Sequence, residues 1–475
     1  MSPVPSLAVI QEALAPVLAE TRELAERFEA AGHRVYLVGG IVRDLLAGRS
    51  IERPDIDLTT DARPAETKRL LEGWADAIWT QGERFGTIGA KRAGRDFEIT
   101  THRAEAYEPD SRKPSVEFAD AIEADLSRRD FTVNAMALTL PEPRLIDPFD
   151  GSADLLVARR LRTPLAPEVS FSDDPLRMLR AARFIAGYGL APDVALTDAV
   201  LALAPRLAIV SAERIRDELD KLMVVDDPTA GLWFLNDTGL FAEFLPEIPG
   251  LRLEQDPIHR HKDVLGHTLA VVRNVRPRKD DGSPNRITRL AALLHDVGKP
   301  KTRSVGGHGV SFHHHEVVGA RMARDRLVAL RYPAHEVEMI TKLVLLHLRF
   351  HGYGEGDGGW TDSAVRRYVR DAGDLLDELN ELTRCDCTTR NERRARELAD
   401  RMDALEARIA RLTEEEELRS IRPDLDGNQV MAVLGVPPGR TVGDAIDFLL
   451  ELRLDEGPLG AEEAERRLRA WWAAR

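Results

Sequence analysis

Apolar residues recur at helical spacing in the first thirty residues of the chain, and the pattern then changes. The early segment carries its apolar residues among acids and arginines, which predicts an amphipathic helix. These positions are Leu7, Ile10, Leu14, Leu18, Leu24 and Phe28. From Arg34 to about Thr139, short runs rich in β-forming residues alternate with helical stretches, which predicts a small α+β domain. The runs are ValTyrLeuVal, AspIleAspLeu, PheGluIleThr and ValAsnAlaMetAlaLeu.

Beyond Asp174 almost every periodic segment has helical spacing, so the rest of the chain is expected to be mostly α-helical. Residues 391 to 420 predict a strongly charged helix with one apolar side, followed by a compact end in which ValProProGlyArg precedes another helix. The apolar side consists of Leu398, Met402, Leu405, Ile409 and Leu412. Proline and glycine breaks mark boundaries or loops near Pro141, Pro164 to Pro167, Pro246 to Gly250 and Pro277 to Pro284.

The composition predicts a soluble protein of several domains. A chain of 475 residues is too long for one core, and 43% hydrophobic with 31% charged residues is typical of globular proteins. No segment approaches the roughly 20 apolar residues that span a bilayer, and the early helix lacks the apolar stretch of a signal peptide. The two cysteines, Cys385 and Cys387, are too few for a disulfide framework, so we expect a cytoplasmic protein. A net charge of -14 argues against indiscriminate nucleic-acid coating and leaves any such binding to local arginine clusters.

Two acids one residue apart, Asp55 and Asp57, follow the run TyrLeuValGlyGlyIleValArgAspLeu. Residues i and i+2 of a strand share a face, so both carboxylates can hold divalent cations such as Mg²⁺. The adjacent glycines, the second of them Gly40, are expected to open a helix and let backbone N–H groups approach a polyanion. Arg43 adds a fixed cation. This layout predicts phosphoryl transfer, whereas an Asp-x-Asp pair by itself would indicate a solvated turn.

A third acid, Glu98, shares a face with polar neighbours on a predicted strand. It is a candidate third metal carboxylate, and an ordinary solvent-facing residue is the alternative. In ArgArgAspPheThrValAsnAlaMetAla, Arg129 is the candidate phosphate contact. Asp130 and Asn134 would orient the sugar or brace the surrounding loop.

The segment AspAspProLeuArgMetLeuArgAlaAlaArgPhe predicts a helix that begins at the proline after Asp174. Asp174, Arg177, Arg180 and Arg183 then form a polar stripe at threefold spacing. A carboxylate and a guanidinium side by side can pair with the amino donor and ring acceptor of cytosine or adenine. Guanine and uracil would leave both groups unpaired, so the pair could select C and A without a template. The alternative is an amphipathic helix with i,i+3 salt links.

An adjacent pair, His295-Asp296, ends an apolar helical segment in LeuAlaAlaLeuLeuHisAspValGlyLys. Together with acids and histidines from other predicted helices it could bind a transition metal that activates water against a phosphate. The further candidate ligands are His267, His315, His347 and Asp386. His313 or His314 could replace His315, since spacing does not separate three consecutive histidines. The order of these residues resembles the HD phosphohydrolase superfamily, and histidines that merely fill core or surface are the alternative.

The motifs with GlyGlyIleValArgAsp, AspIleAsp, ArgArgAspPheThrValAsnAla, the Asp174 segment and SerAlaGluArgIleArgAspGlu resemble, in order, those of bacterial class II tRNA nucleotidyltransferases. These CCA-adding enzymes and their poly(A) polymerase relatives belong to the DNA polymerase beta superfamily, and the resemblance covers roughly residues 34 to 250. It implies metal ligation by Asp55 and Asp57. It also implies nucleotide contacts from Gly40, Arg43 and Arg129, and base selection by Asp174 and Arg177 with support from Arg180 and Arg183. Asp173 departs from the family, which often has Glu there.

The resemblance implies an α+β nucleotidyltransferase head followed by a mostly α-helical neck, HD body and tail. The expected division is an N-terminal helix over 1–33, the head over 34–150, the neck over 151–250, the HD domain over 251–390 and a tRNA-binding tail over 391–475. Gly439 marks backbone amides in the tail that could contact phosphate.

The expected activity is template-independent addition of C, C and A to the tRNA 3′ end from CTP and ATP, with Mg²⁺ at the head. Poly(A) addition, an HD phosphohydrolase with a degenerate head and a nonenzymatic tRNA-binding protein are the alternatives. The sequence leaves open the oligomeric state, the HD metal and whether a partner enzyme divides the C and A additions.

Overall fold

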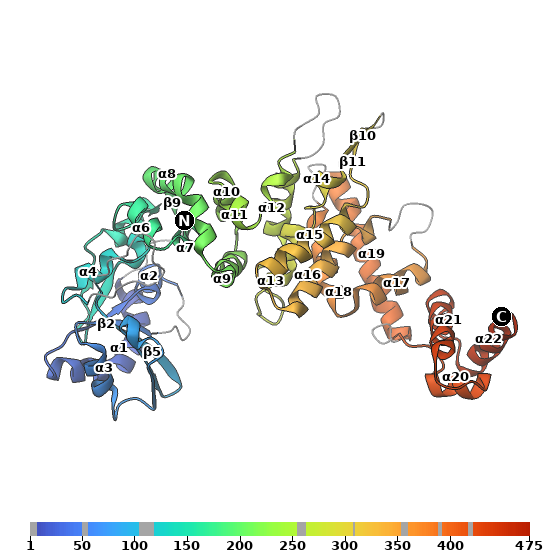
Figure 1. Cartoon of the computed structure of the whole chain (residues 1–475), viewed down its shortest axis with the longest axis horizontal. Coiled ribbons are helices and arrows are strands. Elements are labelled where there is room, and N and C mark those ends of the chain that lie inside the picture. Colours follow the sequence, from blue (N-terminus) through green and yellow to red (C-terminus); the bar gives the residue numbers. More distant parts are fainter. Residues whose placement is uncertain are drawn as a thin grey trace. The chain divides into compact units, whose positions relative to one another are not determined.

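The computed structural model describes residues 7–49, 56–103, 118–253, 263–306, 309–352, 360–387, 392–416 and 421–475 (Figure 1). The chain divides into two compact units, Met1–Phe244 and Leu245–Arg475. This division lies near the predicted end of the neck at residue 250. The finer five-part division stays a prediction.

The first unit begins with a seven-stranded sheet in the order β3-β4-β5-β2-β1-β6-β7, shown in blue to teal in Figure 1. The pair β2–β5 is parallel and the remaining pairs are antiparallel. The strands are β1 Val35–Val38, β2 Ile56–Thr60, β3 Ala77–Trp79, β4 Thr87–Arg92, β5 Arg95–Thr101, β6 Ala137–Leu140 and β7 Leu145–Ile146. The helices of this part are α1 Leu7–Ala30, α2 Gly40–Leu46, α3 Pro64–Leu71, η1 Glu83–Phe85, α4 Ile122–Ser127, η2 Thr132–Asn134, α5 Gly151–Ala153 and η3 Asp154–Ala158.

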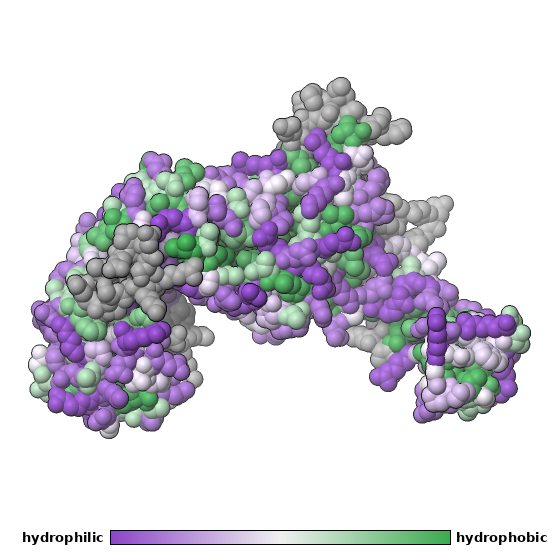
Figure 2. Space-filling view, in the orientation of Figure 1, coloured by the Kyte–Doolittle hydropathy of each residue, from purple (hydrophilic) through white to green (hydrophobic). Residues whose placement is uncertain are grey.

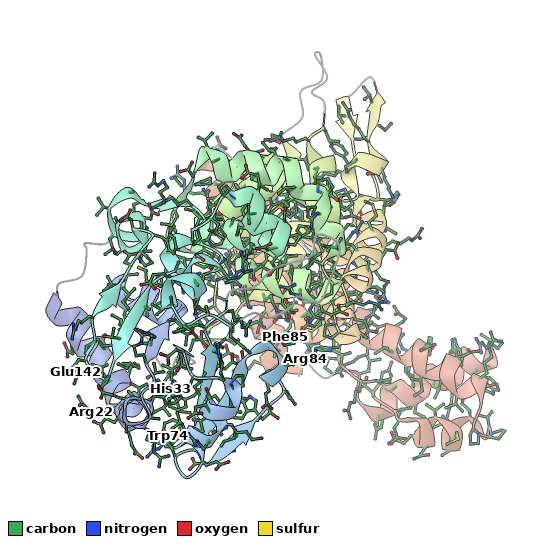
Figure 3. All side chains as sticks on the ribbon, turned by 60° about the vertical axis from the view of Figure 1, so that its left-hand side comes forward. Arg22, His33, Trp74, Arg84, Phe85 and Glu142 are labelled. Atoms are coloured by element: carbon green, nitrogen blue, oxygen red, sulfur yellow. The ribbon has the colours of Figure 1, made fainter. Side chains whose placement is uncertain are left out.

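Buried apolar residues of the central strands form the core of the sheet. Ile56 and Leu58 of β2 and Phe97 of β5 are buried, and Trp74, labelled in Figure 3, packs edge-on against Phe97 with ring centroids 5.1 Å apart. The predicted amphipathic helix is confirmed as α1, whose Leu24 is fully buried.

One predicted strand is displaced. The run ValAsnAlaMetAlaLeu forms a short helical turn, η2, and becomes strand only at Ala137. Two hydrogen bonds of the Asn134 amide stabilise the turn: a local one donated to Asp130 (2.9 Å) and a long-range one accepted from Arg43 of α2 (2.6 Å). The prediction of one continuous strand was therefore wrong at its start.

The rest of the first unit is helical around a two-stranded ribbon, β8 Arg160–Leu161 and β9 Ala191–Pro192. Its central helix α7 begins after Pro175, as predicted, and buries Met178, Ala182 and Phe184. The helices are α6 Pro167–Asp173, α7 Leu176–Tyr188, α8 Val194–Leu203, η4 Ala204–Ile209, α9 Ala212–Met223, α10 Thr229–Asp237 and α11 Leu240–Phe244.

The second unit is almost entirely helical apart from the hairpin of β10 Ser304–Gly306 and β11 Gly309–Ser311. Its first part comprises η5 Pro249–Leu251, α12 Val264–Asn274, α13 Arg286–Leu294, α14 Lys299–Thr302, α15 His315–Ala329, α16 Ala334–Leu346, η6 Arg349–Gly352, α17 Asp362–Ala372, η7 Gly373–Leu375 and α18 Leu376–Asp386. The predicted charged helix is confirmed as α19 Glu392–Glu416, with Met402, Leu405, Ile409 and Leu412 buried along one side.

The chain ends in three helices, α20 Gly427–Leu434, α21 Arg440–Glu456 and α22 Ala461–Ala473, drawn in red in Figure 1. They share a small core that includes Val430, Leu449 and Leu468. Asp426 caps α20 through a reciprocal pair of hydrogen bonds with Gln429. On the face shown in Figure 2, polar and apolar residues are interspersed. Among the described residues, no helix has the length and apolar character needed to cross a membrane.

Candidate active site

A cavity of about 540 Å³ opens beside the sheet of the first unit, and its lining is dominated by acids and arginines. Its residues are Val38, Asp57, Leu58, Glu98, Thr100, Arg103, Asp125, Arg128, Arg129, Arg177 and Arg180. The sheet contributes Asp57 and Glu98, whereas α7 contributes Arg177 and Arg180. The cavity thus brings together candidates that lie 120 positions apart in the sequence.

Two carboxylates lie side by side on neighbouring strands. Asp57 of β2 and Glu98 of β5 are register partners in the parallel pair, so their side chains leave the same face of the sheet. Ile56 and Leu58, on either side of Asp57, are buried and fix which way the strand faces. Asp55 lies outside the described residues. Paired carboxylate oxygens in a polar cavity suit a hard cation such as Mg²⁺.

The glycine turn meets these acids directly. Gly39 has φ +77° and precedes α2, which begins at Gly40 as predicted. A Cβ at Gly39 would lie 3.3 Å from Arg129 Nη1 and 3.4 Å from Asp57 Oδ2. The left-handed backbone and the close approach both favour glycine at this position. The turn, the candidate phosphate arginine and the strand acid therefore form one compact group.

Arg43 is not among the residues that line the cavity. Its side chain is buried, with two hydrogen bonds to Asp44 (3.0 and 2.8 Å) and one to Asn134 (2.6 Å). A Cβ at Gly40 would lie 3.3 Å from Arg43 Nη2, so the guanidinium lies against the glycine turn. The structure therefore places Arg43 as a support of the turn, and its predicted nucleotide contact stays a prediction.

Asp125 was not predicted as a site residue because it belongs to no recognised motif, although it lies one helical turn before Arg129. The two form an ion pair of 3.2 Å, and both line the cavity. The i,i+4 spacing of an acid and an arginine was the available signal. This pairing orients the Arg129 guanidinium at the edge of the cavity.

Asp130 and Asn134 brace the loop that follows α4. Asp130 accepts hydrogen bonds from the Asn134 amide and the Phe131 N–H, both 2.9 Å, and pairs with Arg180 at 2.6 Å. Burial would raise the pKa of Asp130, but Arg180 and the Asn134 hydrogen bond outweigh it and hold the pKa below its usual range. Of the two roles considered for these residues, the contacts correspond to loop bracing.

The polar stripe of α7 divides between the cavity and internal contacts. Arg177 lines the cavity and donates to Ser170 Oγ (2.8 Å) and Arg128 O (2.6 Å). Asp174 precedes the helix, accepts from Arg214 at 2.8 Å, and does not line the cavity. Arg183 forms a short ion pair with Glu218 of α9.

A second polar cluster lies in the helical unit, where α12, α13, α15, α16 and α18 converge. Its ligand atoms form two groups, each with all atoms within 4.8 Å of one another. They are His267, His295 and Asp386 in one group and Asp296, His315 and His347 in the other. All six predicted ligands are therefore brought together. Of the three consecutive histidines, His315 is the one in the cluster, whereas the side chain of His314 is 84% exposed.

The histidines of this cluster are oriented for metal binding. His295, His315 and His347 each donate from Nδ1 to the carbonyl three residues earlier, at 2.7–2.8 Å. Their buried Nε2 atoms have no hydrogen-bond partner among the described residues. The hydrogen bond from Nδ1–H directs each Nε2 toward the cluster, where it can ligate a metal once it carries no proton. The donor set of imidazoles and carboxylates suits a transition metal.

The charged side chains of this cluster shift one another's pKa values. Burial lowers the pKa of His295, but the Asp296 and Asp386 carboxylates prevail and raise it to about 10. Burial and the charge of His295 lower the pKa of His347 to about 3. Lys299 pairs with Asp296 at 2.6 Å. The cluster opens into a cavity of about 190 Å³ whose lining includes His351.

Known sequence families match three successive parts of the chain. The Poly A polymerase head domain matches residues 35–162, and the Probable RNA and SrmB-binding site of polymerase A matches residues 189–251. The HD domain matches residues 264–415. The first match contains the acids and the glycine turn, and the third contains the histidine cluster.

Among known proteins, the A-adding tRNA nucleotidyltransferase of Deinococcus radiodurans is 32% identical over 447 residues, which cover 92% of this chain and 95% of that protein. The CCA-adding enzyme of Streptococcus suis is 38% identical over 232 residues, which cover 49% of this chain and 55% of that enzyme. The match to the latter thus spans about half of each protein.

The fold is that of solved CCA-adding enzymes. The Bacillus stearothermophilus CCA-adding enzyme in complex with CTP superposes with a TM-score of 0.69 at 24% identity, covering 98% of both chains. The Thermotoga maritima CCA-adding enzyme complexed with tRNA gives 0.62 at 19% identity, covering 99% of this chain and all of that one. The predicted fold class, an α+β head followed by a mostly helical remainder, is confirmed.

Proposed function

The chain belongs to the family of tRNA nucleotidyltransferases, and we propose that it adds C, C and A to the 3′ end of tRNA from CTP and ATP, releasing pyrophosphate. The observation that supports this most strongly is the shared cavity in which Asp57 and Glu98 face arginines of α4 and α7. This reaction needs a metal-binding edge and a nucleotide-binding wall, and the acids and arginines that line the cavity support these two roles.

In the proposed reaction, Asp55, Asp57 and Glu98 would hold Mg²⁺, which supplies charge neutralisation at the reacting phosphate when bound. Arg129 and the N–H groups at the start of α2 would bind the triphosphate, since both are donors beside the glycine turn. Asp125 keeps the Arg129 guanidinium in place through its 3.2 Å ion pair. The acids would hold the metal beside the reacting phosphate, and the arginines would stabilise the leaving pyrophosphate.

Base selection is proposed for Asp174 and Arg177. Asp174 Oδ2 accepts from Arg214 and Oδ1 from the Leu176 N–H, and each carboxylate oxygen keeps a second lone pair for a base amino group. Arg177 is anchored by Ser170 and Arg128 at the cavity wall and offers donors to the ring acceptor. Arg180 and Arg183 would support the helix through Asp130 and Glu218.

Addition of A alone is a second candidate function. The relative matched over nearly its whole length is an A-adding enzyme, whereas the Streptococcus suis CCA-adding enzyme matches over about half. An enzyme of this kind would extend tRNA that already ends in CC. Poly(A) addition and an HD phosphohydrolase with a degenerate head are not favoured, because the relatives described above are tRNA nucleotidyltransferases.

The test compares two substrates, tRNA lacking its terminal trinucleotide and tRNA ending in CC, each with CTP alone, ATP alone and both. A CCA-adding enzyme adds two residues to the first substrate from CTP alone and completes it when ATP is present. An A-adding enzyme ignores CTP and extends only the CC-ended substrate. An untemplated run of adenylates on both substrates would refute both proposals, and Asp55→Ala serves as the inactive control.

The histidine cluster is proposed as a transition-metal site held by His267, His295, Asp296 and Asp386, with His315 and His347 completing it. The tail from about residue 391 is proposed to hold the tRNA body, with N–H groups near Gly439 as phosphate contacts. A tRNA substrate and the low cysteine content support a cytoplasmic location.

A further inference from the structure

The C-terminal end of α7 is fastened to the sheet domain by an aromatic side chain that no sequence motif marks. The Tyr188 hydroxyl donates to Asp44 Oδ1 of α2 at 2.8 Å. The guanidinium of Arg43 lies 4.4 Å from the centre of the Tyr188 ring, and that of Arg49 lies 3.9 Å from it. Phe184 stacks on the same ring with centroids 5.4 Å apart and an interplanar angle of 19°. Two cation–π contacts and a charge-assisted hydrogen bond therefore converge on one residue.

These contacts lead directly to the glycine turn. Asp44, which accepts from Tyr188, also accepts two hydrogen bonds from Arg43. The Arg43 guanidinium lies against Gly40 and donates to Asn134. Because Gly39 in turn borders Asp57, an unbroken series of contacts joins the end of α7 to the catalytic edge of the sheet.

We propose that Tyr188 is a positioning residue for nucleotide selection, which fixes α7 against α2 so that the base-reading residues keep their place relative to Asp57. The inference rests on the proposed function, because α7 is the helix proposed to read the base. Tyr188 itself acts through Asp44 and Arg43 and touches no substrate.

The C-terminal end of α7 affects the position of the residues proposed to read the base, because the helix is attached to the sheet domain near both of its ends. The first half of the helix is attached to the sheet domain at Arg177, through Arg128 O, and at Arg180, through Asp130, whereas its C-terminal end is attached at Tyr188. Eight residues separate Arg180 from Tyr188, which is about 12 Å along a helix axis. Contacts at both ends resist tilting of the helix. Without the Tyr188 contact, the helix can tilt about the contacts in its first half, and the side chains of Arg177 and Asp174 would then turn relative to Asp57.

The hydroxyl of Tyr188 stays protonated at physiological pH. Burial raises the pKa of Tyr188 to about 12, and Asp44 adds to the rise, which nearby Arg43 opposes. The contact with Asp44 is therefore a permanent O–H donation. Arg49 and Arg159 also donate to the carbonyls of Gly187 and Tyr188, so the backbone of this helix end is held as well.

The experiment measures the preference for ATP over GTP on tRNA ending in CC, a step shared by the CCA-adding and A-adding alternatives. Full-length wild type is compared with Tyr188→Leu, Tyr188→Phe, Asp174→Ala and the control Phe241→Leu. Phe241 is fully buried in α11, a helix that packs on η4 and α10, so its variant reports a general loss of packing. The ratio of kcat/KM values, the separate kcat and KM, and the Tm are recorded.

Tyr188→Leu is expected to lower the ATP preference about tenfold, mostly through a raised KM for ATP, and Tyr188→Phe about threefold because the ring contacts remain. Phe241→Leu should lower the Tm without changing the preference. If Tyr188→Leu leaves the preference at the wild-type value while Asp174→Ala lowers it, the positioning role is refuted and base selection stands. If Asp174→Ala leaves it unchanged, base selection by α7 is refuted. Should Tyr188→Leu fail to fold, an unchanged preference in Tyr188→Phe refutes the positioning role.

Discussion

Replacing Arg180 by methionine tests the buried ion pair that joins α7 to the loop after α4. Arg180 Nη2 lies 2.6 Å from Asp130 Oδ2, and the Asp130 side chain is only 7% exposed. Removing one partner of a buried pair costs roughly 3–5 kcal/mol, because the other charge is left unpaired. The Arg180 side chain is 36% exposed, so water screens part of the interaction and about 2 kcal/mol is the expected loss.

The loss should depend on pH in a defined direction. In the wild type the pKa of Asp130 is depressed, so its contribution to stability is present at neutral pH and disappears as the pH falls through the folded-state pKa. Without Arg180, burial raises the folded-state pKa of Asp130, and protonation then relieves the unpaired charge. The stability difference between wild type and Arg180→Met is therefore largest near pH 7 and narrows toward pH 4.5.

Thermal unfolding of the intact chain measures this difference. For a unit the size of Met1–Phe244, about 2 kcal/mol corresponds to a decrease in Tm of about 4–8 °C. Arg206→Met is the matched control, since Arg206 donates to the neutral Ser172 carbonyl at 3.1 Å. The reasoning is refuted if Arg180→Met lowers the Tm no more than Arg206→Met does, or if the gap widens as the pH falls.

Further predictions concern the active-site cavity, the histidine cluster and the apolar side of α19. Glu98→Gln should lower the single-turnover rate of nucleotide addition about a hundredfold, measured on tRNA ending in CC, and an unchanged rate would remove Glu98 from the metal site. Affinity of the histidine cluster for Co²⁺, measured by chelator competition, should rise up to about tenfold per pH unit between pH 6.5 and 8.5. The reason is that His295, with a pKa of about 10, must lose its proton to ligate, and a flat profile would contradict this. Leu405→Ala should lower the free energy of unfolding of the second unit by about 3 kcal/mol, because Leu405 is fully buried. Leu398→Ala should lower it clearly less, because Leu398 is only half-buried. Equal losses would contradict the packing described for the apolar side of α19.

Sequence periodicity predicted the local elements that depend on short-range patterns. The apolar side of α19 follows from helical spacing, and the start of α7 after Pro175 follows from the preference of proline for the beginning of a helix. The glycine-led start of α2 follows from the freedom of glycine to adopt a positive φ. The strand prediction for Val133–Leu138 was wrong at its start, because Asn134 bonds locally to Asp130 and across the fold to Arg43, and these hydrogen bonds impose a turn on residues with strand propensity.

Long-range features were beyond reach of the sequence alone. The parallel register of Asp57 with Glu98 joins segments 41 positions apart, and no local pattern encodes which residue faces which. Asp125 and Tyr188 stand outside any motif, yet one orients Arg129 and the other anchors α7. The six metal-ligand candidates could be named because their residue types are rare in apolar helices. Their division into two groups needed the fold.

The most direct test of the central claim is single-turnover AMP addition to CC-ended tRNA by Asp57→Asn. Asp96→Asn is the matched control, because Asp96 lies on β5 beside Lys91 and does not line the cavity. If strand acids hold the cations that drive nucleotide transfer, Asp57→Asn loses at least about a hundredfold in rate while Asp96→Asn keeps the wild-type rate. Undiminished addition by Asp57→Asn would contradict the account.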